Sequence, residues 1–140
     1  MPRERAILQA ILGFGIVSTG LHYTHNFVEV DRYANGPATQ VAILVSWPVL
    51  TAIGLYGYRV YSRGRRREAQ ACLLLYSLLG LTTPLHFLEG SPDIPAFWYA
   101  TIFTDGLAGL ALVAFVAWSA RGYRSRRANA TRAAAPTSVR

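Results

Sequence analysis

Long stretches of this chain contain no charged residue. Residues 6–28, 33–58 and 69–88, which are 23, 26 and 20 residues long, lack Asp, Glu, Lys and Arg, and residues 94–120 contain only Asp105. A helix that crosses a bilayer needs about 20 mostly apolar residues, because each residue adds about 1.5 Å and the hydrocarbon is about 30 Å thick. The pattern therefore predicts an all-α membrane protein with four transmembrane helices.

The predicted helices form one domain that is followed by a tail. We expect the helices over residues 6–27, 39–61, 69–88 and 95–120, within a transmembrane domain of residues 1–122. The connections on either side of the third helix are short, so its neighbours run antiparallel to it, and a four-helix bundle is the economical arrangement. Residues 123–140 are rich in Arg, Ala, Ser and Thr without apolar periodicity, which predicts a disordered basic tail.

The first apolar run is expected to be a span and not a cleaved signal peptide. It is longer than the apolar core of a signal peptide, and no A-x-A-like site follows it. Small residues occur in all the long helices and predict close backbone packing, and Pro48 and Pro84 predict kinks in the second and third helices. The small residues are Gly13, Gly15, Ser18, Gly20, Gly54, Gly57, Gly106, Ala108, Gly109 and Ala111.

Composition and charge fix the expected orientation. Of the 140 residues, 52% are hydrophobic and 15% are charged, well below the roughly 25% charged residues of a soluble domain. All basic residues are Arg, and all but Arg32 lie before the first helix, between the second and third, or after the fourth. The positive-inside rule then places both termini in the cytoplasm, and we expect a bacterial inner membrane.

The same charge distribution bears on partners. The net charge of +7 is explained by topology, so we expect the lipid bilayer as the partner and no nucleic acid. The sequence leaves open a homo-oligomer or a larger membrane complex. It has no GxGxxG, P-loop or GxSxG motif, which excludes the usual devices for nucleotide binding and serine hydrolysis.

The three histidines all lie near the predicted outer ends of helices. On a helix continued to Glu29, the side chains of His22, His25 and Glu29 fall within about 60° of one another and form one polar stripe. His86 and Glu89 repeat this pairing three residues apart near the end of the third helix. These residues predict a polar pocket in the outer half of the bundle.

Asp105 is the candidate with the clearest physical argument. It lies 11 residues after Ile94 and hence about 16 Å along the fourth helix, near mid-membrane. An ionisable group at that depth costs at least a few kcal/mol and usually faces the bundle interior for a functional reason. If the first and fourth helices are neighbours, His22 can approach Asp105, neutralise its charge and have its tautomer fixed by the carboxylate.

Several functions fit these residues. His22, His25, His86 and Glu89 are candidate ligands for one zinc, copper or iron ion, and a histidine pair across the bundle for one b-type haem. Asp105 and Glu29 would then act as general acid or base on a lipid-like or small substrate. The alternatives are a purely structural hydrogen-bonded cap in an accessory or assembly subunit, and a proton-coupled transporter that uses Asp105.

Overall fold

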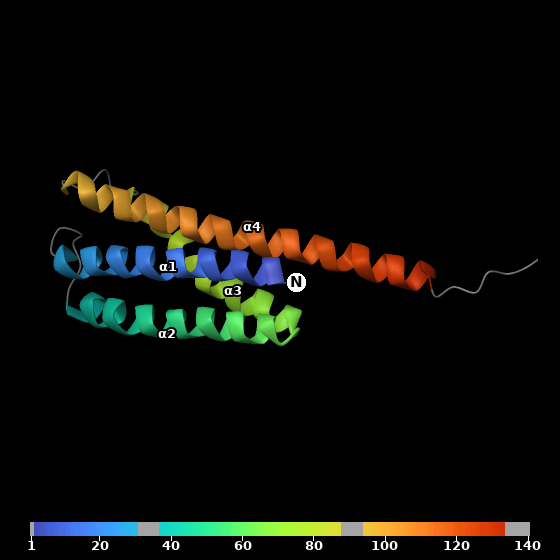
Figure 1. Cartoon of the computed structure of the whole chain (residues 1–140). Coiled ribbons are helices and arrows are strands. Elements are labelled where there is room, and N and C mark those ends of the chain that lie inside the picture. The colour runs from blue at the N-terminus through green and yellow to red at the C-terminus, as the bar shows by residue number, and fades with distance from the viewer. Residues whose placement is uncertain (1, 31–36, 88–93, 134–140) are drawn as a thin grey trace, which may run out of the picture.

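The chain folds into a bundle of helices. The computed structural model describes residues 2–30, 37–87 and 94–133, and these contain four α-helices and one short 3₁₀ helix. They are α1 (Pro2–Val28), α2 (Pro37–Ser62), α3 (Arg66–Leu81), η2 (Thr83–Phe87, the 3₁₀ helix) and α4 (Ala96–Ala133). Both α1 and α3 pack against α2 and α4, and helices that follow one another run in opposite directions (Figure 1). The all-α prediction is confirmed.

Three of the helices are long and apolar enough to cross a membrane. They are α1, the Gln40–Ser62 part of α2 and the Ala96–Tyr123 part of α4. Large apolar side chains such as Val17, Leu44 and Phe103 are more than half exposed on them. Such surfaces are typical of helices that face lipid, because hydrocarbon replaces water around them. The bundle therefore has the surface of a membrane protein over most of its length.

The third helix ends earlier than its apolar pattern predicts. The α-helix stops at Leu81, Thr82 caps it, and the backbone continues as the 3₁₀ helix η2. Pro84 explains the difference, because a proline has no N–H to donate, disfavours α-helical geometry in the preceding residue and clashes with the carbonyl four residues earlier. The prediction of a kinked helix over residues 69–88 is therefore wrong, whereas α2 continues through Pro48.

The fourth helix is longer than predicted. It runs to Ala133, past the expected end at residue 120. The apolar pattern does end near Tyr123, but the following residues are mostly Ala and Arg, which have the strongest helix propensities. The expected loss of regular structure after residue 122 thus does not occur up to Ala133, and residues 134–140 lie outside the described part.

Glycines bring the backbones of α3 and α4 into contact. A Cβ atom added at Gly80 would overlap the carbonyl oxygen of Asp105, and one added at Gly109 would lie 2.9 Å from the carbonyl oxygen of Ser77. On the other side of α3, added Cβ atoms at Gly54 and Gly57 would lie 3.0 Å from side chains of that helix. The predicted close packing is confirmed at Gly54, Gly57 and Gly109 but not at Gly13, where an added Cβ atom meets nothing within 4 Å, and Gly80 was not predicted.

The basic end of the bundle is held by a partly buried ion pair. Arg66 Nη2 donates to Glu4 Oε2 at 3.0 Å, and the Tyr61 hydroxyl donates to the same oxygen at 3.0 Å. The Arg66 guanidinium also lies 5.0 Å from the ring centre of Tyr61 and 5.7 Å from that of Tyr123, so it connects all four helices. Burial opposes its charged form, but the hydrogen bonds and charges of Glu4 and Tyr61 outweigh burial and raise the pKa of Arg66.

The variant Glu4→Gln replaces the carboxylate by an uncharged amide of similar shape. It should lower the free energy of unfolding by about 1–2 kcal/mol, because it leaves a partly buried guanidinium without its carboxylate. A matched control is Glu68→Gln, since Glu68 pairs with Arg65 through side chains that are 48% and 51% exposed. Exposed pairs of this kind contribute about 0–1 kcal/mol. Equal losses for the two variants, measured by denaturant unfolding in detergent, would contradict a role for Glu4 in holding the helices together.

Candidate functional site

A histidine and an aspartate form a buried pair between α1 and α4. His22 Nδ1 and Asp105 Oδ2 are 2.7 Å apart, and the two side chains are 3% and 1% exposed. The second carboxylate oxygen, Oδ1, accepts a hydrogen bond from the Thr19 hydroxyl at 2.6 Å. Both carboxylate oxygens therefore have a partner, and the predicted approach of His22 to Asp105 is confirmed.

The hydrogen-bond role of His22 Nδ1 depends on the charge of Asp105. An ionised carboxylate only accepts hydrogen bonds, so His22 Nδ1 is the donor when Asp105 is charged. The remaining ring nitrogen, Nε2, is then the atom that gains a proton in the imidazolium or donates its lone pair to a ligand. The pair has the arrangement in which a carboxylate orients and strengthens a histidine base.

Hydroxyl groups extend this pair into a polar layer, which we define as Ser18, Thr19, His22, Thr104 and Asp105. Ser18 donates to the Thr104 hydroxyl at 2.7 Å, one residue along from the Asp105 contacts on both helices. The two hydrogen-bonded pairs lie side by side, and all of their donors and acceptors come from α1 and α4. The layer thus links two helices that are far apart in the sequence.

Two further hydroxyls lie on the inner side of this layer. The Tyr76 ring packs against Gly15 and Gly54, and its hydroxyl and that of Thr51 are buried without a hydrogen-bond partner among the described residues. Gly15 lies one helical turn before Thr19, so Tyr76 comes next below the polar layer. The hydroxyls of Tyr76 on α3 and Thr51 on α2 can therefore still donate or accept a hydrogen bond beside the polar layer.

An apolar core separates the polar layer from the basic end of the bundle. Its buried side chains are at most 8% exposed, and all four α-helices contribute to it. Its most deeply buried members include Leu8, Leu12, Leu73, Leu112 and Phe115. Among the described residues this half of the bundle is therefore mostly apolar, and the Tyr76 and Tyr61 side chains bring hydroxyl groups into the same cluster.

The other predicted site residues lie outward from the pair. The His25 ring is fully buried and stacks on Trp98 with 4.8 Å between ring centres, and it lies 6.3 Å from the His22 ring. The Glu29 backbone N–H bonds the His25 carbonyl oxygen at 2.9 Å, so the backbone keeps a helical hydrogen bond one residue past the end of α1. Glu29 forms no hydrogen bond with Asp105, whose contacts go to Thr19 and His22.

The structure describes only some of the predicted metal ligands. His86 lies in η2, but its side chain is outside the described part of the structure, and so is all of Glu89. Across the residues that are described, no three His, Cys, Asp or Glu side chains gather closely enough to hold a metal ion. The structure thus brings together two of the predicted residues, His22 and Asp105, with His25 beside them.

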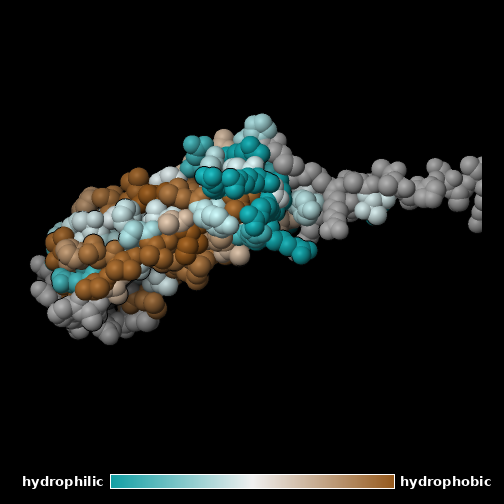
Figure 2. All heavy atoms as spheres, turned by 90° about the horizontal axis from the view of Figure 1, so that it is seen from below, coloured by the Kyte–Doolittle hydropathy of each residue, from teal (hydrophilic) through white to brown (hydrophobic). Residues whose placement is uncertain are grey.

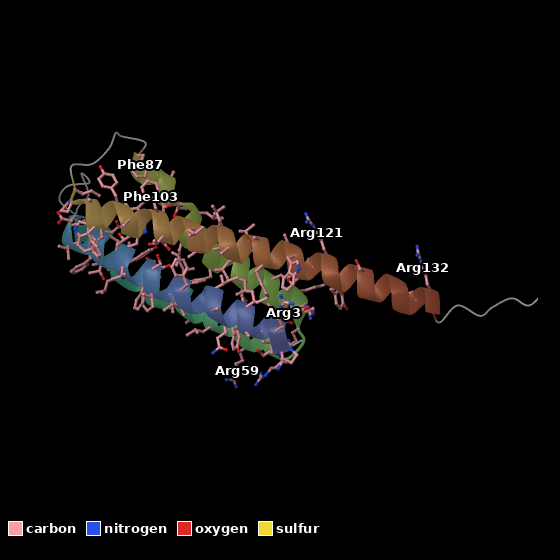
Figure 3. All side chains as sticks on the ribbon, turned by 45° about the horizontal axis from the view of Figure 1, so that its top comes forward. Arg3, Arg59, Phe87, Phe103, Arg121 and Arg132 are labelled. Carbon is pink, nitrogen blue, oxygen red and sulfur yellow. The ribbon has the colours of Figure 1, made fainter. Side chains whose placement is uncertain are left out.

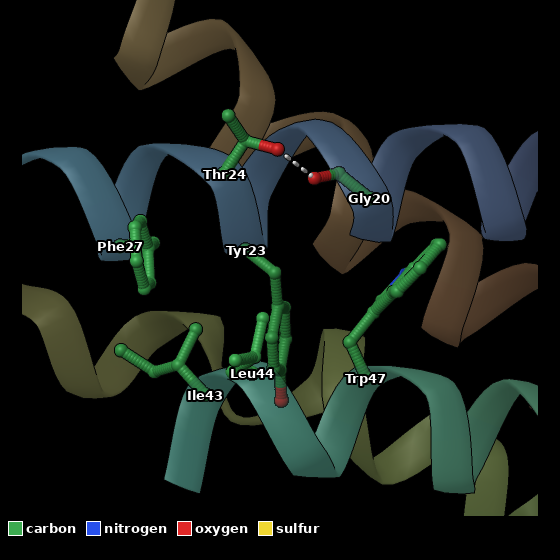
Figure 4. A pocket seen from close by; sticks show the side chains of 7 residues that line it. All are labelled: Gly20, Tyr23, Thr24, Phe27, Ile43, Leu44 and Trp47. Carbon is green, nitrogen blue, oxygen red and sulfur yellow. Dashed lines mark hydrogen bonds between the residues drawn. The ribbon is translucent and has the colours of Figure 1, made fainter. Parts of the chain in front are cut away.

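An apolar groove lies between α1 and α2 at the level of the polar layer. It has a volume of about 280 Å³, and Figure 4 shows its lining side chains, with the Tyr23 ring crossing from α1 toward α2. The lining residues are Gly20, Tyr23, Thr24, Phe27, Ile43, Leu44 and Trp47. The groove and the His22 side chain lie on opposite faces of α1, by helical periodicity. Its shape and lining suit an aliphatic chain.

Sequence reasoning missed three contributors to the site. Thr19 lies three residues before His22 and Trp98 lies seven before Asp105, so helical spacing alone could have assigned each to the face of its neighbour. Tyr76 gave no such signal, because an aromatic residue in an apolar run is ordinarily packed in the core. Its position next to the polar layer depends on how α3 docks.

Comparison with known proteins gave no assignment: no family model matches the chain, and no curated protein or solved structure is similar to it. The fold and the site themselves define the class. This is a small all-helical protein with three helices able to cross a membrane and a buried histidine–aspartate pair.

Proposed function

We propose that this chain is a multi-pass protein of a bacterial inner membrane, and that its His22–Asp105 pair binds and releases a proton. The observation that carries the proposal is the 2.7 Å contact between two ionisable side chains that are both almost fully buried in an apolar bundle. Ionisable groups in such surroundings are costly and usually serve proton relay, ion binding or substrate binding. The pair suits proton binding, because an imidazole nitrogen and a carboxylate oxygen that lie within hydrogen-bond distance can each hold a proton.

The proposed orientation has four spans with both termini in the cytoplasm. The side chains of Arg3, Arg59 and Arg121 all lie near the same end of the bundle (Figure 3). Hydrophilic residues gather at that end on the face that Figure 2 shows, and hydrophobic residues are prominent farther along the bundle. Together with the positive-inside rule, this supports a cytoplasmic basic end and an outer polar layer.

The apolar inner half favours proton exchange with the outer side alone. Leu8, Leu12 and Leu73 are buried in the core on the side of the basic end, so apolar side chains predominate in that direction. A transporter would need a polar path on both sides of its binding site. We therefore infer a protein that senses or uses protons from the outer side, and not a channel within one copy of the chain.

A metal site is the second candidate, and one observation favours it. A carboxylate that holds Nδ1–H of a histidine commonly supports a metal bound to Nε2, and His25 lies beside His22 with 6.3 Å between ring centres. His86 and Glu89 are the further ligands that the sequence predicts. In this case the ion would be zinc, copper or iron, and the buried pair would serve to orient the first ligand.

The proposal is tested by infrared spectroscopy of the detergent-solubilised protein during a pH titration. We expect a carboxylic acid C=O band to appear on acidification and to be missing in Asp105→Asn, which keeps the shape of the side chain but cannot ionise. An identical set of acid bands in the variant and the wild-type protein would show that Asp105 does not exchange a proton, and would remove the basis of the proposal.

Elemental analysis of the same samples separates the two candidates. Near-stoichiometric metal that is lost in His22→Ala would establish the metal site. Metal content that is low and the same in the wild-type protein and this variant, together with the Asp105 band, would support the proton-binding function.

A further inference from the structure

A groove on α2 lies at the basic end of the bundle and has a composition unlike the rest of the surface. Its volume is about 560 Å³, and it combines apolar, aromatic, hydroxyl and guanidinium groups from the end of the helix and the residue that follows it. The lining residues are Leu55, Tyr56, Tyr58, Arg59, Ser62 and Arg63. Arg59 lies in the last turn of α2 and Arg63 is the first residue after the helix, and both line the groove.

The positive charge of this groove is not neutralised within the described residues. The acids of this end are already engaged, since Glu4 pairs with Arg66 and Glu68 pairs with Arg65. No acidic side chain among the residues that the structure describes contacts Arg59. The same holds for Arg63. Two guanidinium groups on one face of a groove are suited to an anion with several oxygens, such as a phosphate diester.

Ser62 adds a hydroxyl group, which can donate a hydrogen bond, to the two arginines of the groove. Its side-chain oxygen is buried and has no hydrogen-bond partner within the described ranges, while its carbonyl oxygen accepts from Arg5 Nη2 at 2.8 Å. The Arg5 contact fixes the backbone of Ser62 at the end of α2. The groove therefore offers a hydroxyl and two guanidinium groups, with Leu55 and two tyrosine rings beside them.

We propose that this groove binds the headgroup of an anionic phospholipid of the cytoplasmic leaflet. The phosphate would lie between Arg59, Arg63 and the Ser62 hydroxyl, and an acyl chain would follow Leu55 toward the membrane centre. The position supports a lipid, because Ser62 ends the apolar segment Gln40–Ser62, where a span reaches the headgroups. This inference depends on the membrane insertion proposed above, but not on the His22–Asp105 pair.

The test measures how much phosphatidylglycerol, added to the full-length protein in neutral detergent, raises its melting temperature. We expect a rise with phosphatidylglycerol and little or none with phosphatidylcholine. The double variant Arg59→Gln/Arg63→Gln should weaken phosphatidylglycerol binding by on the order of 30-fold, from two charges near a membrane surface. The variant Ser62→Ala should weaken it by about 4–12-fold, without any change of charge.

A matched control is the double variant Arg121→Gln/Arg132→Gln. These arginines are exposed on α4, on the opposite side of the bundle from Arg59 (Figure 3), and their replacement removes the same net charge. We expect at most about a 2-fold change in phosphatidylglycerol binding for this control, because the screened attraction of distant charges is weak. An equal loss in both double variants would mean diffuse attraction and would overturn the inference.

Two further outcomes are informative. Inorganic phosphate that competes with phosphatidylglycerol at equal concentration would identify a free-phosphate site and overturn the proposed lipid site. Failure of the chain to insert into phosphatidylcholine vesicles would instead contradict the membrane function itself. Should Arg59→Gln/Arg63→Gln melt at a different temperature without lipid, Ser62→Ala provides the decisive comparison, and unchanged binding in that variant would then overturn the inference.

Discussion

His22→Leu is expected to lower the free energy of unfolding by about 3–5 kcal/mol, because it leaves the carboxylate of Asp105 buried with Thr19 as its one remaining partner. The magnitude is itself diagnostic. Neutral hydrogen-bonded pairs between membrane helices contribute only about 0.6 kcal/mol on average. Equilibrium unfolding in detergent would therefore distinguish a charged pair from a neutral one, and a loss near the smaller value would contradict the charged assignment.

The double variant His22→Leu/Asp105→Leu is the control for this prediction. It removes both charges and fills the space with apolar groups, and such replacements are often neutral or stabilising. We expect the double variant to be more stable than His22→Leu alone, so that the two changes are strongly non-additive. Additive losses would show that the two side chains act independently, despite their contact.

A stable double variant would also bear on function. Since an apolar pair would then hold α1 and α4 together at least as well as the ionisable one, stability would not explain why the chain contains His22 and Asp105. Their presence would have to be explained by chemistry, of which proton binding is the simplest kind that needs both. The stability measurement and the infrared titration thus test the same proposal from two sides.

The sequence was sufficient to predict four α-helices, three of them long and apolar enough to cross a membrane, and the approach of His22 to Asp105. Charge-free runs of about 20 residues predict spans because hydrocarbon excludes charge, and this argument requires no knowledge of packing. Asp105 is the one charged residue in the fourth run, and it was the best site candidate because hydrocarbon excludes charge. Its partner could be inferred because few polar groups occur at that depth, and His22 was one of them.

The details that sequence could not supply depend on docking between helices. The position of Tyr76 below the polar layer is decided by the close contact of α3 with Gly54, which a single helix pattern does not contain. Similarly, the basic segment around Arg66 was explained by topology alone, whereas the structure uses Arg66 to join α1 and α2 through Glu4 and Tyr61. Charge bias predicts where such residues lie, but not which of them are structural.

Local sequence also competed with the apolar pattern at two helix ends. At Pro84 the backbone chemistry of proline ended α3 although the side chains remained apolar. After Tyr123 the helix propensity of Ala and Arg extended α4 although the side chains became polar. Apolar periodicity therefore marked the part of each helix that faces lipid or core, and backbone preferences set where the helix ended.

Gly80→Ala is expected to lower the free energy of unfolding by about 1–3 kcal/mol, although alanine favours helices by about 1 kcal/mol over glycine. The added methyl group would overlap the carbonyl oxygen of Asp105, which is backbone and cannot rotate away, so α3 and α4 must separate. Because Asp105 itself moves, the variant should also alter the infrared band of its carboxyl group. Denaturant unfolding and the infrared titration measure the two effects.

Gly13→Ala is the matched control, because it makes the same chemical change on α1 at a position where an added Cβ atom meets nothing within 4 Å. We expect its stability to be unchanged or slightly higher, through helix propensity alone. The difference between the two variants therefore isolates the α3–α4 contact. Equal stabilities would mean that the backbones of α3 and α4 are not in contact at Gly80, and that the position of Asp105 does not depend on this glycine.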